Sequence, residues 1–177
     1  MCSNLLKQSH CVFWCVALPQ GVATHFFILG YDMKTVTFCG HSRLPLREHE
    51  VIRERVCIET EKLIRQGATE FLLGGYGEFD NMCARVVKEL KTKYPHIISV
   101  LVIPYIERDF DRELYDCSEY PPLEKVPRKF AIVKRNQYMV EKADVVVAYV
   151  KHTGGCAKTY TYAKRKKKHI LLINDCF

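Results

Sequence analysis

The sequence predicts an α/β protein with a mainly parallel sheet, and three observations support this class. Short apolar runs alternate along the 177 residues with longer amphipathic segments. Three of the apolar runs end in glycine-bearing turns. No internal repeat or low-complexity linker interrupts the alternation. Alternating strands and helices form right-handed βαβ units, which place their strands side by side in a parallel sheet.

The first half of the chain supplies two strand–helix pairs. Residues 35–40 are the first expected strand, and residues 47–66 are a charged amphipathic helix that ends before Gly67, a suitable helix stop. Residues 70–73 are the second strand. The second helix covers about residues 80–94, because Pro95 cannot continue it.

The second half begins with a third strand over residues 97–103, followed by an irregular stretch over residues 104–127. This stretch holds four of the seven prolines, and we interpret it as a lid, a binding loop, an interface or plain surface. The third helix is expected over residues 128–142. The fourth strand, 144–150, is a continuous β-branched run typical of a strand covered on both faces. The remaining elements are a fourth helix over 156–167 and a fifth strand over 169–173.

These elements predict a Rossmann-like three-layer sandwich with a five-stranded sheet in the order 3-2-1-4-5. In such sheets ligands bind outside the carboxyl ends of the strands, where the strand order reverses. The glycine turns after strands one, two and four all fall at that edge. The sequence therefore predicts a ligand site there.

Residues 1–32 differ from the rest, with three cysteines, the only tryptophan and no clear period. We expect a weakly structured N-terminal extension, with Met33 as the natural start, and one domain over residues 33–177. An extra strand or a membrane-surface anchor is the alternative for the extension. Lys7 and Asp32 are its only charges and cancel, so the net charge of +7 belongs to the domain.

Composition narrows the class of protein and of partner. The chain is 48% hydrophobic and 27% charged, as soluble globular proteins are, and has no apolar run that could span a bilayer. None of the nine cysteines has C-x-x-C spacing, which favours free thiols in the cytoplasm and no metal site. A basic domain fits a phosphate-bearing small ligand or nucleic acid, and charge does not decide between them.

The strongest site candidate follows the fourth strand. A strand, a glycine turn and a helix direct free backbone N–H groups and a positive helix end at an anion. The residues expected to hold a phosphate there are Gly154, Gly155 and Cys156, with Lys158 and Thr159 nearby. An ordinary turn is the alternative.

The turns after the first two strands add further binding candidates. They are Gly40, His41, Ser42 and Arg43 after the first strand, and Gly74, Gly75, Tyr76 and Gly77 after the second. Glycines there allow a ribose or phosphate to approach the backbone closely. A tight strand–helix turn and a structural histidine are the alternatives.

Three side chains are candidates for chemistry. Glu78 and Asp80 could hold ribose hydroxyls or act as a general base, and Asp80 could instead cap the second helix. Cys156 lies where a helix N-terminus lowers a thiol pKa, but the sequence places no histidine or acid beside it. The basic run 164–168 is interpreted as a solvated helix end rather than a nucleic-acid patch.

Four short motifs resemble the SLOG superfamily (SMF/DprA–LOG), in particular its YpsA-like branch, over about residues 33–173. They are Phe38 to Ser42, Leu73 to Gly77, Arg135-Asn136 with Met139 and Ala143-Asp144, and Gly154-Gly155 with Thr159. The resemblance implies a Rossmann-like fold that binds nucleotides or nucleotide-derived ligands. It adds Arg135 and Asn136 to the expected binding residues.

The LOG enzymes of this superfamily cleave nucleoside 5′-monophosphates between the base and the ribose phosphate. Their motif has an Arg-Lys pair and a P-G-G-x-G-T-x-x-E turn. Here Arg135 matches the arginine, Asn136 replaces the lysine, and the glutamate position falls on Thr161. Threonine cannot act as a carboxylate acid or base. The resemblance therefore supports a phosphate-binding site more strongly than it supports hydrolytic activity.

The expected function is binding of a nucleotide or nucleotide-derived small ligand, as a sensor or sequestering module. One alternative is a LOG-like nucleotide-processing enzyme that hydrolyses an N-glycosidic or phosphoester bond. Single-stranded DNA binding, as in the DprA branch, is the other. No cofactor besides that ligand and no membrane partner is expected, and the sequence leaves turnover and homo-oligomer formation open.

Overall fold

The computed structural model describes residues 34–106, 111, 113–151 and 153–174. The predicted N-terminal extension and Met33 lie outside these residues. No helix in the described part of the chain is both long and apolar enough to cross a membrane.

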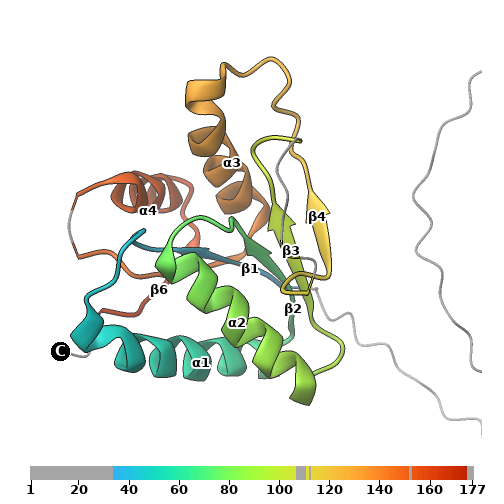
Figure 1. Cartoon of the computed structure of the whole chain (residues 1–177), viewed down its shortest axis with the longest axis vertical. Helices are drawn as coiled ribbons and strands as arrows, with labels where there is room; N and C mark the ends of the chain where they lie inside the picture. Colours follow the sequence, from blue (N-terminus) through green and yellow to red (C-terminus); the bar gives the residue numbers. More distant parts are fainter. Residues whose placement is uncertain (1–33, 107–110, 112, 152, 175–177) are drawn as a thin grey trace, which may run out of the picture. The chain divides into compact units, whose positions relative to one another are not determined.

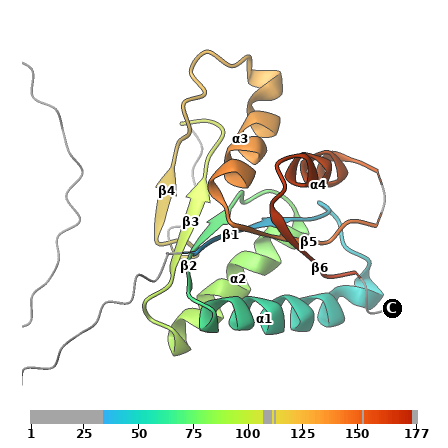
Figure 2. The same cartoon turned by 180° about the vertical axis from the view of Figure 1, so that it is seen from behind.

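A six-stranded sheet forms the centre of the domain, and every strand pairing in it is parallel. The strands are β1 (Lys34–Cys39), β2 (Ala68–Leu73), β3 (Ile98–Val102), β4 (Cys117–Glu119), β5 (Val145–Ala148) and β6 (His169–Leu172). Their order is β4-β3-β2-β1-β5-β6, and Figure 2 labels all six strands. The predicted α/β class and the order of the five expected strands are confirmed. The expected strand count is wrong by one, because β4 is added beside β3.

β4 lies inside the stretch expected to be irregular, and its sequence explains why it was not predicted. It has only three residues, Cys-Ser-Glu, and no apolar run. Its place beside β3 is fixed largely by Asp116, whose carboxylate accepts hydrogen bonds from the backbone N–H and the hydroxyl of Ser99 at 2.8 and 3.0 Å. A polar edge pairing of this kind has no hydrophobic period to reveal it.

Helices cover both faces of the sheet, which gives three layers. They are α1 (His49–Arg65), which follows a short 3-10 turn (Leu46–Glu48), α2 (Glu78–Lys93), α3 (Arg128–Lys142) and α4 (Gly155–Arg165). Helices α1 and α2 pack on one face, and α3 and α4 on the other, as Figures 1 and 2 show from opposite sides. The third helix has the predicted bounds, whereas α2 begins two residues earlier than expected.

Strand β5 is buried on both faces of the sheet. Val145 and Val147 belong to the large cluster formed with α1 and α2, whereas Val146 and Ala148 belong to a smaller cluster with α4. Alternate side chains of a strand point to opposite faces, so this run is buried on both sides, as predicted. The end of β1 lies at the N-terminus of α4, where the thiol of Cys39 donates to the carbonyl oxygen of Cys156 at 3.3 Å.

Candidate functional site

A cavity of about 350 Å³ lies at the carboxyl ends of β1 and β2 and against α3 and α4. It brings together predicted residues from turns that are far apart in the sequence. Those that line it are Gly40, His41, Ser42, Gly74, Tyr76, Asp80, Arg135, Asn136, Gly154, Gly155, Cys156 and Thr159. This is the sheet edge at which the ligand site was predicted.

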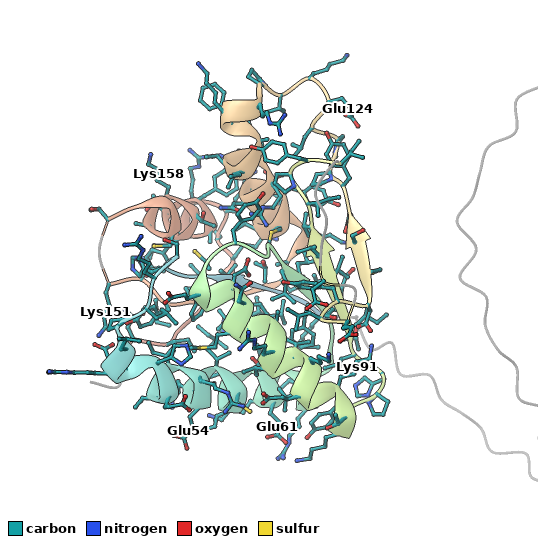
Figure 3. All side chains as sticks on the ribbon, in the orientation of Figure 1. Glu54, Glu61, Lys91, Glu124, Lys151 and Lys158 are labelled. Carbon is teal, nitrogen blue, oxygen red and sulfur yellow. The ribbon has the colours of Figure 1, made fainter. Side chains whose placement is uncertain are left out.

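Five predicted residues do not line this cavity: Arg43, Gly75, Gly77, Glu78 and Lys158. Lys158 belongs instead to a neighbouring cavity of about 280 Å³ between α3 and α4, and Figure 3 shows its side chain directed away from the sheet. Glu78 holds the β1–α1 connection together, because its carboxylate accepts the backbone N–H of Leu44 at 2.6 Å. That hydrogen bond gives Glu78 a structural role.

The N-terminus of α4 is open toward the cavity. Gly154 precedes the helix with a φ of 146°, and no side chain among the described residues caps the first turn. A methyl group built on Gly154 or Gly155 meets nothing within 4 Å. Helix N-termini carry free N–H groups and about half a positive charge. An anion in the cavity can therefore approach this end of α4 without obstruction.

Glycines of the turns after β1 and β2 are required for a different reason. A Cβ on Gly40 would lie 2.2 Å from the Phe79 ring, and one on Gly74 would lie 1.9 Å from Nη1 of Arg135. Gly77 has a φ of 94° and would clash with Ser42. Close packing within the protein accounts for these three positions.

Arg135 and Asp80 form a charged pair in the cavity wall. Arg135 is 2% exposed, donates to the carbonyl oxygen of Val102 at 3.1 Å and stacks over the ring of Tyr76. Asp80 accepts the backbone N–H groups of Gly74 at 3.3 Å and Tyr76 at 2.9 Å. The nearby carboxyl group of Asp80 thus interacts with the positive charge of Arg135 inside the protein.

The position of Asp80 corrects one alternative from the sequence. Gly77 is the N-cap of α2, and Asp80 lies in the first helical turn and holds the preceding loop. Burial raises the pKa of Asp80, while the charge of Arg135 and the N–H donors of the loop oppose that rise. Asp80 is therefore a cavity carboxyl whose proton is held more strongly than usual, the property a general acid needs.

His41 and Cys156 form a contact that the sequence did not predict. Nδ1 of His41 lies 3.1 Å from Sγ of Cys156, and both side chains are buried, 7% and 8% exposed. Their contact joins the end of β1 to the first turn of α4. The two residues are 115 positions apart, so only the strand order brings them together.

Several lining residues were not expected to contribute: Thr37, Phe38, Cys39, Ile132, Met139, Val140 and Thr153. Most lie on β1 or on the buried side of α3, where an apolar pattern indicates core rather than a site. For the three on β1, the signal that could have found them is their place near the end of a predicted strand. Asn136 joins α3 to α4 here, because its amide donates to the hydroxyl of Thr159 at 3.4 Å.

The comparisons with known proteins concern structure alone, since no family model and no curated protein matches the sequence. The protein TM1055 aligns with a TM-score of 0.54 at 19% identity, over 78% of this chain and 72% of its own. DNA processing protein A of Helicobacter pylori, described by its single-stranded DNA binding mode, gives 0.55 at 16%, over 80% and 66%.

A third structure is the molybdenum cofactor carrier protein of Chlamydomonas reinhardtii. It aligns with a TM-score of 0.54 at 17% identity, over 79% of this chain and 76% of its own. At such identities a likeness shows the fold and not the ligand. The chain shares a Rossmann-like α/β fold with these proteins, which agrees with the fold class predicted from the sequence.

Proposed function

We propose that the cavity binds a nucleotide or nucleotide-derived small ligand, with a phosphate at the N-terminus of α4. The observation that carries this proposal is the open space in front of Gly154 and Gly155 at an uncapped helix end. Backbone N–H groups at such an end bind phosphate without any lysine or arginine. A cavity of about 350 Å³ also has the size of a small-molecule site.

Side chains of the wall suit the remainder of such a ligand. Tyr76 is exposed beside the Arg135 guanidinium, and a flat base can stack on an aromatic ring of this kind. Asn136 and Thr153 supply an amide and a hydroxyl, the groups that hydrogen-bond ribose hydroxyls or base edges. The two similar structures described as a cofactor carrier and a DNA-binding protein are also named for binding.

A binding role is favoured over LOG-like hydrolysis by Thr161. Its hydroxyl donates to the carbonyl oxygen of Ala157 at 2.9 Å within α4, so it supplies no acid or base to the cavity. Asp80 is the cavity carboxyl left for that task, and its oxygens already accept two backbone N–H groups. Adenosine monophosphate is therefore expected to bind without rapid release of adenine.

Two measurements test the proposal. Mass spectrometry of small molecules released from the purified, heat-denatured protein should recover a phosphate-bearing compound. Calorimetric titration should show saturable binding of adenosine monophosphate, with chromatography showing the nucleotide intact. Absence of any released phosphate compound, together with no heat of binding from adenosine monophosphate or inorganic phosphate, would overturn it. Rapid adenine release, abolished by Asp80→Asn, would establish the enzyme instead.

A further inference from the structure

The neighbouring cavity of about 280 Å³ forms a groove between α3 and α4, two helices that lie beside each other in Figures 1 and 2. This α3–α4 groove shares four lining residues with the cavity at the sheet edge: Ile132, Asn136, Gly155 and Thr159. Along α4 it reaches as far as Arg165. Because an α-helix rises about 1.5 Å per residue, the groove follows roughly 15 Å of α4.

Little separates the groove from the cavity at the N-terminus of α4. Gly155 lies on this boundary, and a methyl group built on it would meet nothing within 4 Å. On the same boundary the amide of Asn136 donates to the hydroxyl of Thr159 at 3.4 Å, which is long for a hydrogen bond of this kind and therefore weak. A ligand with a phosphate at the end of α4 can thus continue past Gly155 into the groove.

The walls of the groove offer apolar and planar surfaces. On α3, Ile132 is 38% exposed and Val133 is 46% exposed. On α4, the guanidinium of Arg165 lies 4.9 Å from the centre of the Tyr162 ring, and the hydroxyl of Tyr162 donates to Glu141, which fixes the ring in place. Nucleobases stack on aromatic rings and on guanidinium planes, so these walls suit a second base.

The polar groups of the groove suit the edge of a base and an anionic ligand. Among the described residues, no group hydrogen-bonds the side-chain amide of Gln137, which lines the groove. An amide both donates and accepts, and glutamine pairs in this way with the N6 and N7 atoms of adenine. The described lining includes two cations, Lys158 and Arg165, and no carboxylate. Its charge therefore favours a phosphate-bearing ligand.

We propose that the ligand is a dinucleotide, with its linking phosphate at the N-terminus of α4, one base beside Tyr76 and the second base in the α3–α4 groove. This inference rests on the function proposed above, from which it takes the position of the phosphate. The shared chemistry is two nucleosides joined through phosphate, either 3′–5′ through one phosphate or 5′–5′ through two. A mononucleotide leaves the groove empty, so the second nucleoside adds contacts that a mononucleotide cannot make.

Calorimetric titration tests the second half of the ligand. Adenylyl-(3′–5′)-adenosine is compared with the methyl ester of adenosine monophosphate, and diadenosine diphosphate with the methyl ester of adenosine diphosphate. Each control keeps the phosphate linkage and lacks the second nucleoside. One of the dinucleotides should bind at least about tenfold more tightly than its control, since a stacked base contributes a factor of this order. The linkage that binds more tightly identifies the class of dinucleotide.

Two results would overturn the inference, and they differ in what they leave standing. If adenosine monophosphate binds but neither dinucleotide binds more tightly than its control, the groove holds no second base, while the proposed function stands. If no nucleotide and no inorganic phosphate binds, the proposed function fails and this inference fails with it.

A substitution in the groove locates the second base. Val133 lines the groove but not the first cavity, so Val133→Glu should weaken the favoured dinucleotide about tenfold more than it weakens adenosine monophosphate. Ile58→Glu is the matched control, because Ile58 is 41% exposed on α1, which packs on the other face of the sheet. It should change neither affinity. Equal weakening of both ligands by Val133→Glu, or none, would overturn the inference.

Light scattering separates a ligand in the groove from a second copy of the chain. An oligomeric state that Val133→Glu leaves unchanged supports the ligand, whereas a dimer that this variant dissociates would make the groove an interface and overturn the inference. If circular dichroism shows that Val133→Glu does not fold, Gln137→Ala decides the question. Loss of the amide should weaken the dinucleotide several-fold more than adenosine monophosphate, and an unchanged ratio would overturn the inference.

Discussion

Replacing Gly155 by aspartate should make the protein more stable and its ligand binding weaker. Gly155 is the first residue of α4, is exposed, and has open space where a side chain would be added. Its φ does not lie in the left-handed region, so an aspartate enters without backbone strain. The substitution therefore places a carboxylate at the helix end proposed to hold a phosphate.

The two effects have estimable sizes. A negative side chain in the first turn of a helix stabilises it by about 0.3–1 kcal/mol, and replacing a helical glycine adds a few tenths more. The carboxylate and a phosphate dianion about 4 Å apart in water repel each other by roughly 1 kcal/mol for each of the two charges. About 2 kcal/mol of lost binding free energy corresponds to a roughly 30-fold weaker Kd.

Calorimetric titration with adenosine monophosphate and thermal unfolding without it measure both effects. Gly155→Asn is the matched control, because it adds nearly the same volume without a charge and should weaken binding much less. If Gly155→Asp binds as tightly as the original protein, the phosphate does not lie at this helix end. If Gly155→Asn weakens binding equally, bulk rather than charge is responsible and the electrostatic reasoning fails.

Three further predictions concern stability. Gly74→Ala should lower the free energy of unfolding, measured with denaturant, by about 1–3 kcal/mol, because the added methyl displaces the buried guanidinium of Arg135. A loss below about 0.5 kcal/mol would contradict the close contact between Gly74 and Arg135. Lys167→Gly should raise the free energy of unfolding in urea by about 1 kcal/mol, because Lys167, just after α4, has a left-handed φ of 54° that glycine adopts without strain. An unchanged free energy would mean that the lysine is not strained there. Hydrogen bonds, first from Lys93, lower the pKa of Glu61 to about 2, so its stabilisation is complete above its unfolded pKa near 4.5 and is lost as pH falls toward 2. Glu61→Gln should therefore be less stable at neutral pH and converge with the original protein in acid, which stability curves against pH would contradict if they stayed parallel.

The strand order could be predicted because each long element carries its own signal. Val145 to Val147 form a continuous β-branched run, and the helix over 128–142 has an apolar period that ends where the structure ends it. β4 could not be predicted, since it is held by the Asp116 carboxylate and by pairing with β3. Hydrophobic patterning reveals strands that bury apolar side chains, and the polar edge strand β4 buries none of this kind in its three residues.

The site shows the same division between local and distant information. Gly154 and Gly155 could be proposed as site residues from a local order of strand, glycine turn and helix. The meaning of Gly40 and Gly74 depends on Phe79 and Arg135, which pack against them from elsewhere in the fold. For the same reason, the contact of His41 with Cys156 had no sequence signal, because it requires two turns on separate strands to meet at one edge.

Among the described residues, little of the positive charge lies at the cavity, whose lining includes one cation, Arg135. Lys151 pairs with Glu48 at 2.6 Å, and Lys166 pairs with Glu141 at 2.9 Å beyond the far end of α4. Lys164 lies over the Tyr160 ring and Arg165 over the Tyr162 ring, at the exposed end of α4 that is far from the cavity.

What faces the cavity is the end of a helix, which supplies about half a charge from backbone groups and can serve one phosphate. Nucleic acids are bound by many separate cations, and their affinity falls steeply as salt displaces counterions, by nearly one power of salt concentration for each phosphate contacted. A ligand held by the α4 end should show a salt dependence no steeper than a single phosphate contact gives. A steep dependence would move the binding surface to the basic run and favour single-stranded DNA over a small ligand. The separation of the net charge from the cavity is thus the structural reason to expect a small phosphate-bearing ligand rather than a polyanion.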